Sequence, residues 1–147
     1  MNTVQLQIKI LEHRRASDSD ILEAEQSFGV KFPEDFKRFI KSYDAAIFQD
    51  NSLDGDLDLQ LSCLIEICKM IETVKDLERD SIFPAYAIPF GEDSNGNLFY
   101  LWMGSVFFWD HEIEEGGDLQ VAPSFTDFMQ RLMPFDFTAM FGDDGIA

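Results

Sequence analysis

The segment from Ile88 to His111 limits the fold more than any other, because two tight-turn signals divide it into apolar stretches of strand length. Asn95-Gly96 is a strong signal for a type I′ hairpin, and Gly104-Ser105 fits a second tight turn. Strands joined by such short turns run antiparallel. The segment therefore predicts a β-meander made of two hairpins.

If both hairpins pair in simple register, the alternation of side chains gives the meander two apolar faces. One face holds Ile88, Phe90, Leu101, Met103, Val106 and Phe108, and the other holds Leu98, Tyr100, Trp102, Phe107, Trp109 and His111. Helices are therefore expected over at least one face. Pro89 has no backbone N–H, so its strand lies at a sheet edge or contains a bulge that shifts this register.

Two helices are predicted before the meander and close together in sequence. The first starts near Asp20, with Ser17 or Ser19 as its N-cap, and ends at Gly29 in a left-handed cap. The second begins around Pro33, which the first turn of a helix tolerates. Its apolar residues recur at helical spacing and face the core: Phe36, Phe39, Ile40 and Tyr43.

Two more helices are expected, one on each side of the meander. Residues 63–78 turn one apolar face inward: Leu64, Ile67, Ile71, Val74 and Leu77. Ser124 and Asp127 resemble a capping box at the start of a last helix, whose apolar residues are Phe125, Phe128, Met129 and Leu132. The alternation in residues 54–61 predicts a half-buried strand, and the weaker alternation in 3–11 fits a strand or part of a helix.

The chain contains no repeat, linker or low-complexity tract. We therefore predict one α+β domain over residues 1–147, a mostly antiparallel sheet packed with about four helices, with 133–147 as a tail.

Acidic side chains are in large excess, 28 against 11 basic ones, which gives a net charge of −17. Residues 80–147 hold 12 acids and a single base, Arg131. Such a field repels nucleic acid and anionic membranes and attracts a basic partner, although acidity also commonly serves solubility alone. Without a membrane-length apolar run or a signal-peptide pattern, a cytoplasmic location is expected.

The sequence offers little for binding a metal or a cofactor. Cys63 and Cys68 are expected to be buried, reduced thiols, and with two histidines they do not complete a standard zinc site. The carboxylate-rich segments that begin at Asp54 and Asp93 lack the Gly and Glu that a calcium loop needs at its sixth and twelfth positions. We predict no metal and no cofactor.

Asp110, His111 and Glu112 are the residue types of acid/base catalysts, but strand alternation places His111 on the face opposite the two carboxylates. In the simple register Glu92 opposes Phe99, which opposes Asp110, so Glu92 and Asp110 remain as a pair for two-carboxylate chemistry. No nucleophile or glycine-rich phosphate loop accompanies them. We predict no enzyme, and an uncharacterised activity of this pair is the least favoured alternative.

Four segments, taken in order, resemble the SUKH superfamily, which includes the fungal cell-wall-assembly regulator domain. They are ILEAEQSFGVKFPEDFKRFIKSYD, AIPFGEDSNGNLFY, VFFWDHE and VAPSFTDFMQRL, within about residues 20–132. The chain departs from the family at Asp44-Ala45-Ala46, where members often have Asn-Gly or Gly-Gly. It also has only Gly104-Ser105 where many members have a longer charged hairpin.

The resemblance implies an α+β domain on one sheet, without a known catalytic centre. Bacterial members typically are immunity proteins that neutralise a toxin encoded beside them, and eukaryotic members are interaction modules in signalling and cell-wall control. We predict an immunity protein for a basic toxin, such as a nuclease, with a general interaction module as the alternative. The candidate partner-binding residues are acids near strand ends and loops, with two tryptophans as anchors if exposed: Asp50, Asp54, Asp56, Asp58, Glu92, Asp93, Asp110, Glu112, Glu114, Glu115, Asp118, Trp102 and Trp109.

Overall fold

The computed structural model describes residues 5–78, 84, 86–112 and 118–134. Its elements, in chain order, are β1 (Ile10–Arg14), α1 (Asp18–Phe28), α2 (Glu34–Tyr43), β2 (Asp44–Phe48), β3 (Asn51–Leu53), β4 (Cys63–Leu64), α3 (Ile67–Glu78), β5 (Ile88–Glu92), β6 (Leu98–Trp102), β7 (Ser105–Trp109), β8 (Asp118–Ala122), α4 (Phe125–Arg131) and β9 (Leu132–Pro134).

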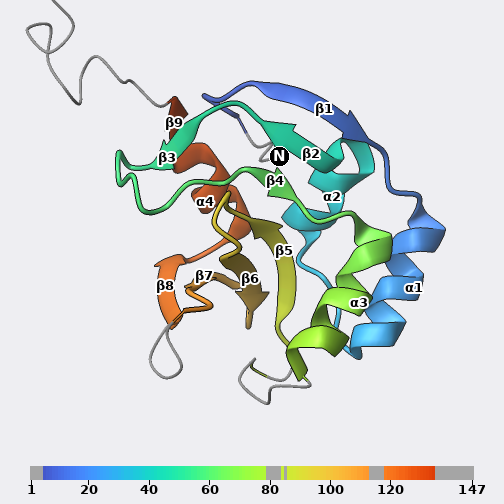
Figure 1. Ribbon diagram of the computed structural model, residues 1–147. Helices are drawn as coiled ribbons and strands as arrows, with labels where there is room; N and C mark the ends of the chain where they lie inside the picture. Colours follow the sequence, from blue (N-terminus) through green and yellow to red (C-terminus); the bar gives the residue numbers. More distant parts are fainter. Residues whose placement is uncertain (1–4, 79–83, 85, 113–117, 135–147) are drawn as a thin grey trace, which may run out of the picture.

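The main sheet has seven strands in the order β1-β2-β4-β5-β6-β7-β8, and a second sheet pairs β3 with β9. Every strand pairing within the described residues is antiparallel. Figure 1 shows α1 and α3 side by side next to the sheet, with α4 on the side of the molecule that also carries β3 and β9. The α+β class is thus confirmed.

Local capping residues set the helix ends, as the sequence predicts. Ser17 is the N-cap of α1: its Oγ accepts the N–H of Asp20 at 3.0 Å, and the Asp20 carboxylate accepts the N–H of Ser17 at 3.2 Å. Gly29 ends this helix at φ +70°, a left-handed conformation that glycine adopts at little cost. Ser124 caps α4 through the N–H of Asp127 at 3.0 Å.

The core lies between one face of the sheet and helices α2 and α4. Phe36, Phe90, Phe125 and Phe128 are completely buried, and their rings meet edge to face, with centroids 5.1 Å apart for Phe36 and Phe125 and 5.8 Å apart for Phe90 and Phe128. The predicted inward stripe of α2 is confirmed for all but its last residue. That residue, Tyr43, remains 37% exposed.

One predicted element is wrong, and another begins later than predicted. Residues 54–61 form turns rather than a strand, because Asp54 and Gly55 take left-handed φ values of +54° and +86° that no extended strand tolerates. The predicted helix over 63–78 begins only at Ile67, after the short strand β4. Its start is fixed by the buried carboxylate of Asp44, whose Oδ1 accepts the N–H of Ile67 at 3.1 Å. Near the N-terminus, β1 overlaps the segment 3–11, for which a strand or part of a helix was predicted, only at residues 10 and 11.

The meander is confirmed, but both of its turns differ from the prediction. The first is a loop closed by a hydrogen bond from the N–H of Asp93 to the carbonyl of Asn97, at 3.1 Å. Only Gly96 has a positive φ within this loop, whereas a type I′ turn needs two such residues. The second turn is Met103-Gly104, at φ +50° and +83°, one residue earlier than predicted. Trp102 therefore pairs with Ser105.

The two faces of β6 and β7 are as predicted, because the shift in their pairing leaves the alternation unchanged. Strand β5 lies inside the sheet, between β4 and β6, and its register shifts between Pro89 and Gly91. Of the two alternatives for Pro89, the bulge is therefore correct and the sheet edge is wrong.

Ala45 occupies a left-handed position, with φ +56°, at the start of β2. This is the place where the SUKH superfamily often has glycine, and a residue with a Cβ adopts this conformation only at a cost.

Candidate partner-binding surface

Three segments far apart in sequence enclose a polar depression of about 790 Å³, called here the acidic hollow. They are the connection between β3 and β4, the loop between β5 and β6, and the turn after β7. The acids that line the hollow are Asp58, Asp93, Asp110 and Glu112. Four of the predicted partner-binding residues therefore converge, although they are spread over more than fifty positions of the chain.

The loop between β5 and β6 is organised by Asp93, which is only 8% exposed. Its Oδ1 accepts the N–H groups of Asn95 and Asn97 at 2.8 and 2.9 Å, and its Oδ2 accepts the side-chain amide of Asn97 at 2.9 Å. These are the bonds of an Asx turn, in which a carboxylate replaces a backbone acceptor. Asp93 thus gives this wall of the hollow a fixed shape.

His111 binds the same loop from the opposite side. Its backbone N–H donates to Asn97 Oδ1 at 3.1 Å, and a second bond of 2.7 Å joins His111 Nδ1 to that oxygen. A Cβ at Gly96 would lie 3.4 Å from the imidazole ring, an ordinary contact distance, so it is the φ of +88° rather than the space that favours a glycine here.

The predicted separation of Asp110, His111 and Glu112 onto two faces is wrong, because all three line the acidic hollow. Strand β7 ends at Trp109, and residues after a strand end no longer alternate between its faces. Asp110 Oδ1 accepts the N–H of Glu112 at 2.9 Å and bends the chain into a turn. Three segments of polar side chains thus share one depression, but no nucleophile paired with a base is found among the residues that line it.

Glu92 and Asp110 do not form the predicted carboxylate pair. Glu92 pairs with Leu98, and Leu98 pairs with Trp109, so the register on which the pair depended is displaced. Glu92 lines a different depression, of about 340 Å³, where it accepts the thiol of Cys63 at 3.3 Å. Burial and the Glu92 carboxylate raise the pKa of the Cys63 thiol to about 12, which keeps it protonated and unreactive.

The second cysteine also departs from its prediction, because Cys68 is exposed rather than buried. Partial desolvation of the thiol still raises its pKa, helped by the nearby carboxylates of Asp20 and Glu66. Both cysteines are free thiols.

The other predicted partner-binding residues lie outside the hollow. Asp50 and Asp56 are exposed in the connections that flank β3, and Asp118 accepts the Tyr100 hydroxyl at 2.6 Å. Trp109 is 6% exposed and belongs to the core, so it does not serve as a surface anchor, whereas Trp102 is 36% exposed and packs against Phe107. Glu114 and Glu115 lie outside the described residues.

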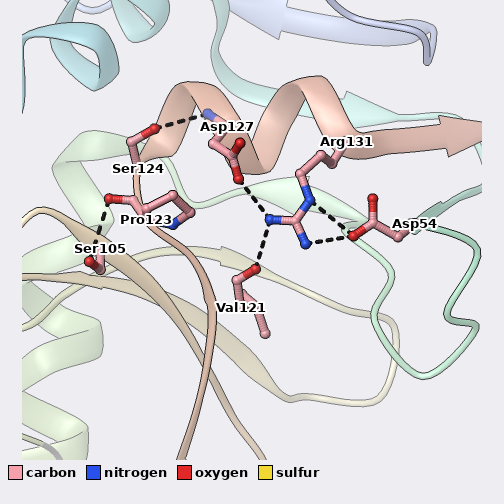
Figure 2. A network of polar contacts seen from close by, with 7 residues as sticks. All are labelled: Asp54, Ser105, Val121, Pro123, Ser124, Asp127 and Arg131. Carbon is pink, nitrogen blue, oxygen red and sulfur yellow. Dashed lines mark hydrogen bonds and ion pairs between the residues drawn. The ribbon is translucent and has the colours of Figure 1, made fainter.

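Asp54 is bound to Arg131, a residue that the sequence analysis noted only as a lone base. Figure 2 shows the guanidinium of Arg131 between Asp54 on one side and Asp127 on the other, with the carbonyl of Val121 below. A hydrogen bond accepted from the guanidinium lowers the pKa of the Asp54 carboxyl, and the hydrogen bonds that Arg131 donates to Asp54 and then to Asp127 raise the pKa of Arg131. The signal for this role was present, because Arg131 is the only base after residue 79.

Asn51 is the other structural residue that sequence reasoning missed. It is 2% exposed, its amide donates to the carbonyls of Gln49 and Leu61, and its Oδ1 accepts the N–H of Leu61 at 2.9 Å. Nothing in the local sequence distinguishes it from an ordinary turn asparagine.

The four acids of the hollow have no ion pair with any lysine or arginine of the described chain. In residues 5–78, 84, 86–112 and 118–134, no three His, Cys, Asp or Glu side chains are placed to hold a metal ion. No helix in these ranges is long and apolar enough to cross a membrane. The hollow is therefore a polar, negatively charged surface of defined shape.

The sequence matches the model of the SMI1 / KNR4 family (SUKH-1) over residues 15–131, and the chain belongs to this family. The match includes all three segments that line the hollow, and it confirms the predicted superfamily. Among the curated proteins, none matches the chain. Membership supports a domain of the immunity or cell-wall-regulator kind, which generally acts by binding another protein rather than by catalysis.

Proposed function

We propose that the protein is an immunity protein that neutralises a cognate, basic toxin by direct binding, and that the acidic hollow is the centre of the bound surface. The family supports the general class, and the geometry of the hollow supports the place and the sign of the charge. The observation that carries the proposal is that Asp58, Asp110 and Glu112 share one depression and have no cationic partner in the described chain.

The shape of the hollow supports binding rather than mere solubility. Asp93 fixes one wall through hydrogen bonds with the backbone and the side chain of Asn97, so the loop that forms this wall is held in place before any partner arrives. A preorganised surface binds with a smaller loss of conformational entropy. Lysine and arginine side chains of a partner would supply the positive charges with which the acids of the hollow are not paired in the described chain.

A toxin that acts on nucleic acid needs a basic groove for phosphate groups. An acidic surface that docks into such a groove occupies the place of the phosphates and blocks the substrate. One molecule of this protein would thus neutralise one toxin molecule by binding alone, without any chemical step.

The test is co-expression in bacteria with the toxic domain encoded beside the gene. We expect the wild-type chain to co-purify with this domain and to restore growth. The double variant Asp58→Lys, Glu112→Lys should lose both, because neither side chain accepts a hydrogen bond within the described structure and the change acts on charge alone.

The matched control is Glu23→Lys, Glu72→Lys, which changes the net charge equally at exposed sites on α1 and α3. It should restore growth as the wild type does. Equal rescue by the two double variants would contradict the acidic hollow as the bound surface. A wild-type chain that co-purifies without rescue would instead favour the general interaction module.

A further inference from the structure

Arg131 joins its own helix α4 and the neighbouring strand β8 to a segment that is distant in sequence. Its Nε and Nη2 donate to Asp54 Oδ2 at 2.9 and 2.5 Å, and its Nη1 donates to Asp127 Oδ2 at 2.7 Å and to the carbonyl of Val121 at 3.1 Å. The backbones are joined as well, because the N–H of Asp54 donates to the carbonyl of Arg131 at 3.1 Å. The guanidinium therefore links the β3–β4 connection to both α4 and β8 (Figure 2).

The segment held by Arg131 is a wall of the acidic hollow. It runs from Asp54 to Gln60 and contributes Leu57, Asp58 and Gln60 to the lining. Bonds within the segment fold it on itself: the N–H of Asp58 donates to Asp56 Oδ1 at 3.0 Å, and the Gln60 amide donates to the carbonyl of Leu57 at 3.0 Å. These hydrogen bonds hold the segment in one shape, so its place beside the hollow depends on how its two ends are attached to the rest of the fold.

The two ends are attached in different ways. At the C-terminal end the buried side chain of Asn51 holds the backbone of Leu61 through two hydrogen bonds. At the N-terminal end Asp54 and Gly55 turn the chain sharply with left-handed φ values, and the Asp54 side chain is fixed by Arg131. Without Arg131, the side-chain attachment at this end is lost.

Arg131 is poorly suited to act by its charge at a distance. It is bound to two carboxylates, and it does not line the hollow. Its planar fork, by contrast, fits a carboxylate with two N–H donors at once, which a lysine ammonium does not reproduce. The geometry therefore indicates positioning rather than attraction.

We propose that Arg131 is the positioning residue of the acidic hollow: its forked bond to Asp54 fixes the loop wall that brings Asp58 to the same depression as Asp110 and Glu112. This inference rests on the proposed function, because it explains how the docking surface keeps its shape. It assigns to Arg131 a role in partner binding although Arg131 itself does not touch the partner.

Four variants of the full chain separate positioning from charge. Arg131→Gln and Asp54→Asn break the fork and change the net charge in opposite directions, whereas Arg131→Lys breaks it and leaves the charge unchanged. Asp127→Asn is the matched control. It removes the second carboxylate that Arg131 binds and keeps the bond between Arg131 and Asp54.

The first readout is amide hydrogen exchange of residues 54–60, with the urea midpoint measured in parallel to follow global stability. We expect exchange in this segment to accelerate about fivefold or more in the first three variants, the effect of losing one exposed forked ion pair, and to remain unchanged in Asp127→Asn. Slow exchange in Arg131→Lys would overturn the proposal, because the charge alone would then suffice.

The second readout uses a hexalysine peptide as the basic probe, with backbone amide chemical shifts recorded by NMR. In the wild type the peptide should shift amides in both walls, at Asp58 and at Asn95, Asn97 and His111. In Arg131→Lys the response at Asp58 should be lost while that of the other wall persists, which a merely structural role would not produce.

The two proposals fail in different ways. A hexalysine peptide that shifts neither wall of the wild type would overturn the acidic hollow as a docking surface. Unchanged exchange of residues 54–60 in both Arg131→Gln and Asp54→Asn would overturn the role of Arg131, whatever the peptide does. Equal hexalysine responses at Asp58 in wild type and Arg131→Lys would also overturn it.

Discussion

The helical region and the acidic hollow use the same acidic residue types in opposite ways. Around α1, α2 and α3, carboxylates are held by basic side chains: Asp18 is 2.9 Å from Lys41, Glu34 is 2.9 Å from Lys37, and Glu66 pairs with Arg14. In the hollow, Asp93 and Asp110 bind backbone N–H groups and, among the residues that the structure describes, no base. The first arrangement neutralises charge at the surface, and the second builds a loop whose charge stays available.

The difference shows why net charge alone does not locate an interface. Exposed ion pairs contribute little to stability and cancel much of the local field. Carboxylates that bind backbone N–H groups contribute more, and they keep a negative potential at a fixed position.

Asp93→Ala should destabilise the protein by about 2–3 kcal/mol, because the side chain is buried and accepts three hydrogen bonds that form the loop. Urea denaturation measures this change. Asp93→Asn is the control, since its amide oxygen still accepts one or more of these bonds and the loss should be smaller. An equal loss in both variants would show that the charge, and not the loop, is what matters.

Asp44 offers a test by pH. Burial raises the pKa of its carboxyl to about 6, against the opposing effect of the N–H groups of Ile67 and Ala45. Between about pH 4 and 6 the Asp44 carboxyl is therefore protonated in the folded state and ionised in the unfolded state. Its contribution to stability falls as the pH rises through this window. Removing a carboxyl of this kind should remove the pH dependence.

We therefore expect the free energy of unfolding of the wild type to rise, relative to that of Asp44→Asn, by up to about 3 kcal/mol as the pH falls from 7 to 4. The asparagine keeps an oxygen for the N–H of Ile67, so the start of α3 is preserved. The measurement is the free energy of unfolding of both proteins across this range. A difference that does not change with pH would mean that Asp44 titrates normally.

Ala45→Gly should stabilise the protein by about 0.5–1 kcal/mol. The alanine has φ +56°, and glycine relieves the steric cost of this conformation while adding some entropy to the unfolded chain. Thermal unfolding gives the sign directly. Ala46→Gly, at the fully buried neighbour without a positive φ, is the control and should destabilise.

Asp18→Asn should change stability by about 0.5 kcal/mol or less, since its side chain is largely exposed and its partner Lys41 is half exposed. Urea denaturation in low and high salt checks this value. The comparison with Asp93 is the point of the experiment. A loss at Asp18 as large as that at Asp93 would remove the distinction between the two regions.

The sequence predicted the elements that depend on neighbouring residues. Ser17, Gly29 and Ser124 act within one helical turn, so their roles are visible in the local pattern. The inward stripe of α2 and the faces of β6 and β7 follow from periodicity in the same way. Family membership was predictable for the same reason, because the recognised segments are continuous.

The sequence did not predict what depends on distant contacts. The start of α3 is set by Asp44, twenty-three residues earlier, and the wall of the hollow is set by Arg131, seventy-seven residues after Asp54. The alternation of 54–61 was misleading, because Leu59 and Leu61 are buried from a turn-rich loop rather than from a strand. The candidate acids were found by composition, but which of them line the hollow, and which of those build its loops, depends on the fold.

The decisive measurement is the association rate of the chain with the proposed basic toxin, recorded by stopped flow across a range of salt concentrations. We expect Asp58→Lys, Glu112→Lys to slow association by about tenfold or more at low salt and to flatten the salt dependence, while Glu23→Lys, Glu72→Lys has a much smaller effect. Equal slowing by the two double variants would contradict the account, because the charge of the acidic hollow would then have no special role.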